Sequence, residues 1–179
     1  MMSDDAGVLS LKRRPLLRAS ALIVRGDEVL LVKQSKDGVE YWLLPGGAVE
    51  RGEAITEAVR REVGEETGYK VRVLEPPIGL IESISPDQGR SRHLVHLVYY
   101  CRLEAAPSTE PATGTAHVDP TILESKWWSR ARLPELVIHP PIHDLLNEWL
   151  EYLSVLESQG EEVLPQNLPP LVSTGPRWV

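Results

Sequence analysis

One stretch of this sequence limits the possible folds more than any other: a glycine turn followed by a helix that a second glycine ends. The spacing predicts a helix over residues 53–67, with Gly68 as its C-terminal stop. At about 100° per residue, Ile55, Ala58 and Val59 form an apolar stripe along one side of this helix. We expect this side of the helix to be buried against the rest of the fold.

Three carboxylates lie where the stripe continues. Steps of three and four residues along the helix lead to Glu62, Glu65 and Glu66, where a purely structural helix would carry Leu or Val. Like charges at this spacing repel, and bound divalent cations would remove that cost. Mg²⁺ is favoured because it takes oxygen ligands and is often shared with substrate phosphates. Arg61 lies four residues before Glu65 and can brace the carboxylates. The alternative is a solvated acidic face with ordinary ion pairs.

Apolar stretches separated by turn signals predict strands around this helix. Arg25-Gly-Asp is the expected turn of a hairpin between the first two of them. Such tight spacing does not fit an all-parallel sheet, so a mixed α/β or α+β architecture is predicted. The expected strands are residues 21–24, 29–32, 41–44, 70–75, 78–84, 94–103 and 122–128, and a second helix is expected at 142–157.

The glycine–helix–glycine stretch resembles the Nudix box of MutT-like proteins, whose pattern is G-x5-E-x7-R-E-U-x-E-E-x-G-U with U aliphatic. The one departure is Tyr69 at the last aliphatic position. The likeness extends to Trp42–Gly47 before the box and to Trp127-Trp128-Ser and Leu133-Pro-Glu-Leu after it. The matching positions are Gly47, Glu53, Arg61, Glu62, Val63, Glu65, Glu66 and Gly68.

The resemblance implies the Nudix fold, a mixed β-sheet sandwiched between helices, with the box as loop, helix and loop. It also implies a hydrolase that uses Mg²⁺, with Mn²⁺ as a substitute. Glu62, Glu65 and Glu66 would hold the metal, Glu53 would support the metal site and Arg61 would orient it. Gly47 would let the backbone turn close to the metal or to a phosphate.

Hydrolysis of a phosphoanhydride needs neutralised phosphate charge, a positioned water and a stabilised leaving group. Metal ions supply the first and activate the water. Our hypothesis is attack by water on a nucleoside diphosphate linked to another moiety: a nucleoside triphosphate, ADP-ribose, a nucleotide sugar or a dinucleotide. Glu65 or Glu66 is the candidate general base. Glu124, shortly before Trp127, is a further candidate, and its alternative is a surface acid at a strand end.

Residues that would select the substrate are less well marked. Arg90 and Arg92 lie in a polar loop and can contact phosphates in a bidentate manner, or they belong to a solvated hairpin loop. Trp42 can stack on a base, or it packs in the core. Pro86 is displaced from the position that marks ADP-ribose enzymes of the family, so the resemblance does not name the substrate.

The composition of the chain limits the kinds of partner and the cellular setting that we expect for it. The net charge of −7 excludes a broad basic surface, so we expect a small nucleotide substrate and no stable nucleic-acid partner. There is no apolar run of 18 residues for a membrane span. The single cysteine, Cys101, fits a reducing, cytoplasmic setting. A homodimer is compatible with the family.

The chain divides into an N-terminal arm (1–15), a Nudix hydrolase domain (16–158) and a proline-rich C-terminal tail (159–179), which is expected to be extended or without order. The rival function is a Nudix-fold sensor that binds a nucleotide without cleaving it. Such proteins commonly lose box carboxylates, and this chain retains all of them.

Overall fold

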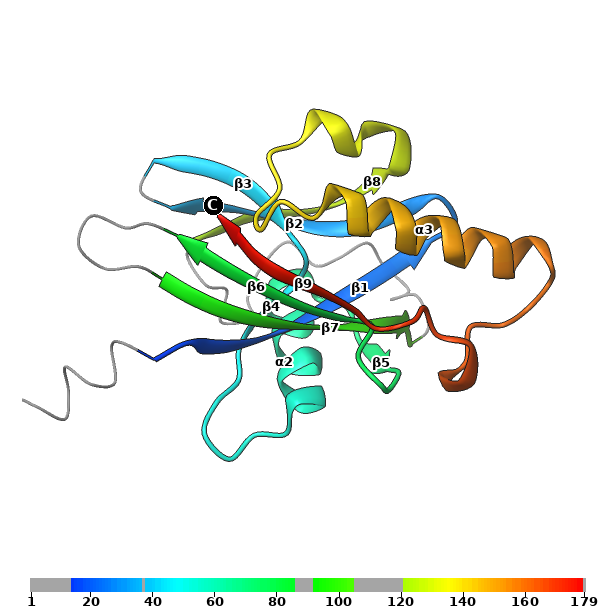
Figure 1. The fold of residues 1–179 in the computed structure, drawn as a ribbon, viewed down its shortest axis with the longest axis horizontal. Coiled ribbons are helices and arrows are strands. Elements are labelled where there is room, and N and C mark those ends of the chain that lie inside the picture. Colours follow the sequence, from blue (N-terminus) through cyan, green and yellow to red (C-terminus); the bar gives the residue numbers. More distant parts are fainter. Residues whose placement is uncertain (1–13, 37, 86–91, 105–120, 179) are drawn as a thin grey trace, which may run out of the picture.

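The computed structural model describes residues 14–36, 38–85, 92–104 and 121–178 (Figure 1). Strands precede and follow the box helix, and a second long helix comes late in the chain. In order, the elements are β1 (Leu16–Arg25), β2 (Glu28–Lys36), β3 (Val39–Leu43), β4 (Gly46–Ala48), α2 (Ile55–Thr67), β5 (Val71–Val73), β6 (Gly79–Ser85), β7 (Arg92–Leu103), β8 (Ile122–Ser129), the 3₁₀ helix η1 (Arg130–Glu135), α3 (His143–Ser158), the 3₁₀ helix η2 (Pro165–Asn167) and β9 (Val172–Trp178).

The strands of the described residues form one mixed sheet. Its main order is β3-β2-β1-β7-β6-β9, while β4 pairs with β1, β5 with β7 and β8 with β2. The pairs β1–β7 and β6–β9 are parallel, and the other pairs are antiparallel. The mixed sheet confirms the prediction made from the tight hairpin spacing. Within the described part of the chain, no helix has the length and apolar character that crossing a bilayer requires.

Two hydrophobic clusters lie on opposite faces of the sheet, because side chains alternate along each strand. On β1, Ala19, Ala21 and Ile23 pack against α2, whereas Leu22 faces α3. The helices α2 and α3 therefore cover different faces, as Figure 1 also shows. The α2 cluster comprises Ala19, Ala21, Ile23, Leu30, Ala58, Val59, Val63, Val71, Val73, Tyr99 and Cys101. The α3 cluster includes Leu22, Leu31, Val98, Tyr100, Leu146 and Trp149.

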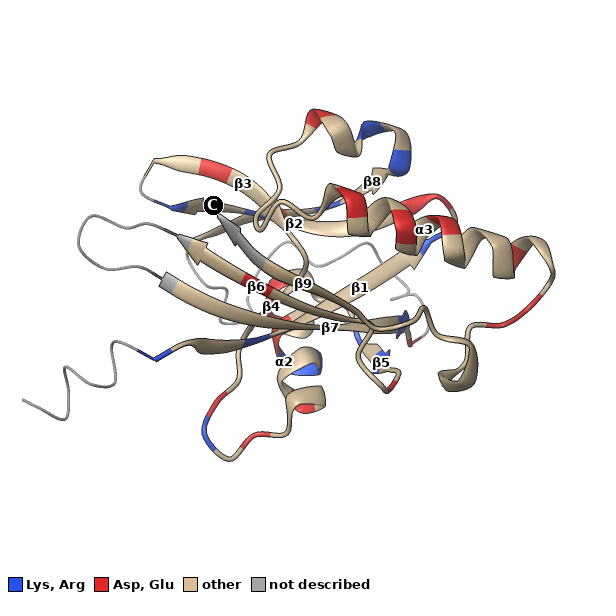
Figure 2. Cartoon of the chain, in the orientation of Figure 1, with Lys and Arg blue, Asp and Glu red and all other residues tan. Residues whose placement is uncertain are grey.

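The apolar stripe of α3 is buried as its spacing predicted. Trp149 is the largest side chain there and is 1% exposed. It packs over Gly79 of β6, where an added Cβ would lie 2.9 Å from the indole ring. The opposite side of α3 is exposed and carries acidic residues (Figure 2), namely Asp144, Glu148, Glu151 and Glu157.

Three parts of the chain differ from the sequence-based expectation. Residues 46–48, expected to be part of a turn, form the short strand β4 on β1. The proline-rich tail contains η2 and then β9, which lies in parallel beside β6. Residues 53 and 54 precede the box helix, which begins at Ile55.

Candidate functional site

The turn that precedes α2 lies unusually close to β1. Gly46 has a φ of 146°, a backbone conformation that side chains rarely allow. A Cβ on Gly46 would overlap the backbone of Ala19 and Ser20. The amide of Ala21 also donates to the carbonyl of Pro45 at 2.8 Å. The turn is therefore fixed on the central strand, directly beside the box helix.

Gly47 brings the backbone into contact with the first box carboxylate. A Cβ on Gly47 would overlap the carboxyl group of Glu62. The Glu62 side chain is 15% exposed. Glycine is needed here because the carboxylate occupies the space of a side chain.

Arg61 donates hydrogen bonds to three of the carboxylates near the turn. Its Nε and Nη2 donate to the two oxygens of Glu53 at 2.8 and 3.0 Å, a bidentate pair. Its Nη1 donates to Glu62 at 2.7 Å and to Glu65 at 3.3 Å. Arg61 therefore connects the loop before α2 to both carboxylates on the helix.

The charge pairing lowers the pKa of Glu53 to about 2, first through its hydrogen bonds from Arg61 and then through the amide of Glu50. The same pair raises the pKa of the Arg61 guanidinium. Glu53 and Arg61 are thus an ion pair throughout the neutral range.

Glu66 reaches back to the turn from the last part of α2. Its Oε2 accepts a hydrogen bond from the amide of Gly46 at 2.7 Å. One carboxylate of the helix thus contacts the turn at Gly46, and another contacts it at Gly47.

The buried line of α2 differs from the expected one. It continues from Ala58 and Val59 to Val63 and Thr67, while Glu62, Glu65 and Glu66 are half-buried along its edge. The physical reason is the spacing of four residues from Val59 to Val63 and from Val63 to Thr67, which keeps the apolar side chains under the helix. The carboxylates are therefore partly shielded from water but open towards the turn.

The donor chemistry of this edge suits a hard divalent cation, because it offers several carboxylate oxygens beside a glycine backbone. Among the described residues, however, no three His, Cys, Asp or Glu side chains are gathered as a metal centre. Glu62 and Glu65 instead contact Arg61, and Glu66 contacts Gly46. The residue types fit a metal site, and loading it requires these carboxylates to exchange their present partners for the ion.

A cavity lies on the other face of the sheet, on the side of α3. Arg18 lines it and donates from Nη2 to the carbonyl of Gly46. His96 also lines this cavity and is 6% exposed. The hydroxyl oxygen of Ser83 lies 3.0 Å from Nε2 of His96. Burial and then the charge of Arg18 lower the pKa of His96 to about 3, so its ring is neutral in the neutral range. The lining residues are Arg18, Ser20, Leu43, Leu44, Ile81, His96, Val98, His139, Pro140 and Ile142.

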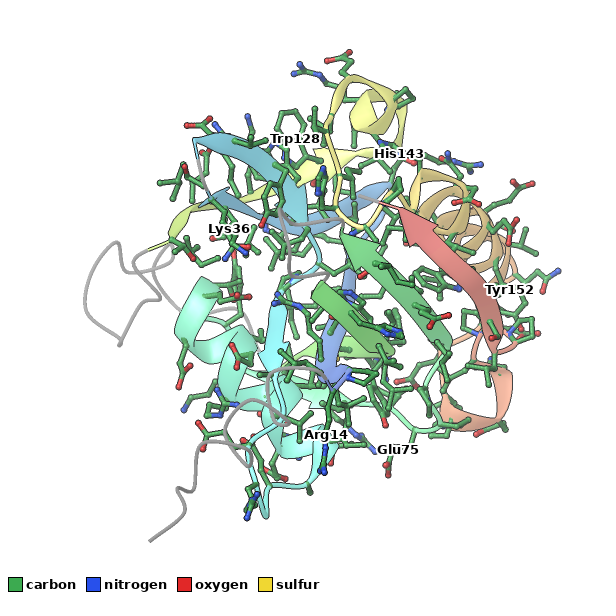
Figure 3. All side chains as sticks on the ribbon, turned by 60° about the vertical axis from the view of Figure 1, so that its left-hand side comes forward. Arg14, Lys36, Glu75, Trp128, His143 and Tyr152 are labelled. Atoms are coloured by element: carbon green, nitrogen blue, oxygen red, sulfur yellow. The ribbon has the colours of Figure 1, made fainter. Side chains whose placement is uncertain are left out.

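The structure does not bring every predicted residue to the box. Trp42 is 7% exposed and packs edge-on against Trp128 with ring centroids 5.1 Å apart, which favours the core alternative over the predicted contact with substrate. Figure 3 shows Trp128 beside β2 and β3. Glu124 is exposed and pairs across the strands with Lys33, on the face of Trp128 rather than that of α2. Glu65 and Glu66 therefore remain the candidate bases.

The two loop arginines give little further information. Arg90 lies outside the described residues, and the backbone of Arg92 begins β7 opposite Ser85. Sequence reasoning missed Arg18, His96 and the rest of the cavity. The available signal was an arginine, and then a serine two residues later, within an otherwise apolar strand.

Comparisons with known proteins relate this chain to proteins of the Nudix family. A model of the NUDIX domain matches residues 14–150. The human protein named 8-oxo-dGDP phosphatase NUDT18 is 32% identical over 146 residues, which cover 80% of this chain and 40% of that protein. Putative nudix hydrolase 1 from Caenorhabditis elegans is 37% identical over 117 residues, covering 62% of this chain and 28% of that protein. This chain thus spans less than half the length of both relatives.

A solved structure shows the same fold. The NUDIX hydrolase from Nitrosomonas europaea superposes with a TM-score of 0.62 at 20% identity, covering 87% of this chain and 96% of that one. At that identity the likeness concerns the fold alone. Together with the match over residues 14–150 and the spacing of the box, it shows that the chain belongs to the Nudix family.

Proposed function

We propose that this chain is a Mg²⁺-dependent hydrolase that cleaves the phosphoanhydride bond of a nucleoside diphosphate or of a nucleoside diphosphate linked to another moiety. The observation that carries the proposal is the placement of Glu62 and Glu66 of α2 against the Gly46–Gly47 turn, with Arg61 between Glu53 and Glu62. Such a concentration of half-buried carboxylates is costly unless cations neutralise it.

The roles follow from the contacts. Glu62, Glu65 and Glu66 would hold the metal, which when bound neutralises phosphate charge and activates water. Glu53 keeps Arg61 in place through the bidentate pair. Glu65 is 37% exposed, more than Glu53 or Glu62, and has the longest of the Arg61 contacts. It is therefore our candidate for accepting the proton of the attacking water.

The cavity beside Arg18 has a volume of about 10 Å³, which has room for a water molecule but not for a nucleobase, so the nucleoside end of the substrate is left to the substrate screen. The name of the human relative makes 8-oxo-dGDP the first substrate to try.

The test of this function is a hydrolysis screen with Mg²⁺, and with Mn²⁺ in its place. Substrates are 8-oxo-dGDP, dGDP, nucleoside triphosphates, ADP-ribose, nucleotide sugars and dinucleoside polyphosphates, with the phosphate products identified. We expect turnover of at least one diphosphate-containing compound and its loss with EDTA. Tight nucleotide binding without turnover of any compound would instead support the sensor alternative.

A single substitution separates the carboxylate's role from folding. Glu66→Gln removes a charged metal ligand but keeps the size of the side chain, so we expect turnover to fall by about 10²–10³-fold with an unchanged unfolding midpoint. Glu57→Gln is the matched control, because Glu57 is exposed on the same helix and pairs with Arg60. Near-wild-type turnover in Glu66→Gln would reject the assigned role.

A further inference from the structure

Gly46 is held from two sides by groups that belong to different parts of the molecule. Its amide donates to Glu66 of α2 at 2.7 Å, and its carbonyl accepts from the guanidinium of Arg18 on β1. Its Cα lies so close to β1 that a Cβ would overlap Ala19. Gly46 is therefore fixed in position, and whatever holds Gly46 also locates the Glu66 carboxylate.

Arg18 faces away from α2. It is the cross-strand neighbour of His96, and both side chains line the cavity on the α3 face. Its contact with the carbonyl of Gly46 is partly buried. Loss of a partly buried donor leaves that carbonyl without its charged partner, which favours a shift of the turn towards water or another donor. A shift of the turn moves the amide on which Glu66 depends.

We propose that Arg18 is a positioning residue that sets the place of the Glu66 carboxylate through Gly46, and so supports metal binding from the opposite face of the sheet. The inference rests on the proposed function, because it takes Glu66 as a metal ligand. It differs from a role in substrate contact, since the effect of Arg18 is transmitted through the backbone and is present without nucleotide.

The experiment is a titration of the full-length chain with Mn²⁺, in which free Mn²⁺ is followed by electron paramagnetic resonance without nucleotide. We expect Arg18→Met to weaken Mn²⁺ binding by about 10-fold, the lower end of the effect of residues that orient metal ligands. Arg18→Lys keeps a charged donor and should recover part of the affinity. Arg25→Met is the matched control, because Arg25 lies on the same strand and pairs with exposed Glu28.

A double-mutant cycle of Arg18→Met with Glu66→Gln tests whether Arg18 affects metal binding through Glu66. If Arg18 acts through Glu66, Arg18→Met has little further effect on Mn²⁺ affinity in the Glu66→Gln background. In steady-state assays of the wild-type background, Arg18→Met should lower kcat more than it raises KM. Equal unfolding midpoints of Arg18→Lys and wild type show that any change is local.

Each of the other possible results rejects the positioning role of Arg18 or the proposed function. Unchanged Mn²⁺ affinity with a raised KM makes Arg18 a substrate contact and rejects the positioning role. Additive effects of the two substitutions reject the route through Glu66. Weak binding in both Arg18→Lys and Arg25→Met assigns the loss to general destabilisation of β1 and also rejects it. Absence of Mn²⁺ binding to the wild-type chain, with or without nucleotide, overturns the proposed function itself.

Discussion

At the scale of single residues, the box contains glycines that are present for different reasons. Gly47 lies where a side chain would overlap the Glu62 carboxyl group. Gly64 lies inside α2, and the nearest atom to an added Cβ is the carbonyl oxygen of Tyr69 at 3.9 Å. The first glycine makes room for a carboxylate, whereas the second leaves room for a methyl group.

These two positions give opposite predictions for the same change. Gly47→Ala displaces Glu62, and because misplacement by about 1 Å costs about 100-fold, we expect turnover to fall by that order. Gly64→Ala should leave turnover unchanged and raise the free energy of unfolding by about 0.5–1 kcal/mol, since alanine favours helix more than glycine does. Both are measured by steady-state kinetics and urea unfolding. Equal turnover of the two variants would contradict the close approach of Gly47 to Glu62.

His96 gives a prediction for pH. Its folded pKa of about 3 lies below the ordinary 6.5, so the unfolded chain takes up a proton before the folded protein does. The stability contributed by neutral, buried His96 is complete above about pH 6.5. It falls at a rate approaching about 1.4 kcal/mol per pH unit as the pH drops towards 3. Urea unfolding at about pH 7, 5.5 and 4.5 should show a shallower decline in His96→Gln. Parallel declines in both proteins would refute this.

The residues of the box were predictable because chemistry fixes their spacing along one helix. Arg18 was not, since its contact with Gly46 depends on the register that places Ser20 opposite Gly46 and Arg18 opposite Ala48. Periodicity within a strand tells which face a side chain occupies, but not which distant backbone group lies beside it. The same limit explains why the sequence left two interpretations of Trp42, whose contact with Trp128 no strand periodicity predicts.

At the scale of elements, Trp149 is the largest of the buried side chains that hold α3 on the sheet. Gly79→Ala places a Cβ 2.9 Å from the Trp149 ring and 3.3 Å from Val98, so the helix must shift outward. We expect a loss of about 1–3 kcal/mol in the free energy of unfolding. Gly175→Ala on β9 is the control, because an added Cβ there has no described atom within 4 Å. Chemical denaturation compares the two, and equal midpoints would mean that α3 does not pack as described.

Long elements with one strong period were predictable. The stripe of α3 and the β1–β2 hairpin follow from alternation or helical spacing over many residues. The short strand β4 was not, because three residues carry no period and the two glycines are typical of turns. Its strand geometry comes from pairing with β1, which is tertiary context.

At the scale of the whole molecule, the sheet is extended by a strand from the far end of the chain. Val172 packs against the α3 cluster, and its amide donates to the carbonyl of Ile78 at 3.0 Å. The prolines of the tail conceal this strand from composition-based reasoning, because they are typical of segments without regular structure.

The first residue of β9 and the residue just before the strand test the contribution of β9 to stability. Val172→Ser should lower the free energy of unfolding by about 1 kcal/mol, since it removes apolar contact with the core. Leu171→Ser should change it by less than about 0.5 kcal/mol, because Leu171 is 58% exposed. Thermal unfolding of both variants provides the comparison. A larger effect at Leu171 would indicate that this end of the sheet is covered by another surface.

The parallel pairing of β1 with β7 has a consequence for how the chain reaches its native state. Leu16 pairs with Leu94 and Gly79 with Val172, so the two parallel pairs join segments that lie 78 and 93 residues apart in a chain of 179. Non-local pairing of this kind slows folding, while neighbouring hairpins and helices form sooner. During synthesis, the edge of β1 that receives β7 stays uncovered until residue 103 has left the ribosome. A nascent chain of this sequence therefore exposes an unpaired strand edge for much of its translation, and that interval is when it most needs protection from aggregation.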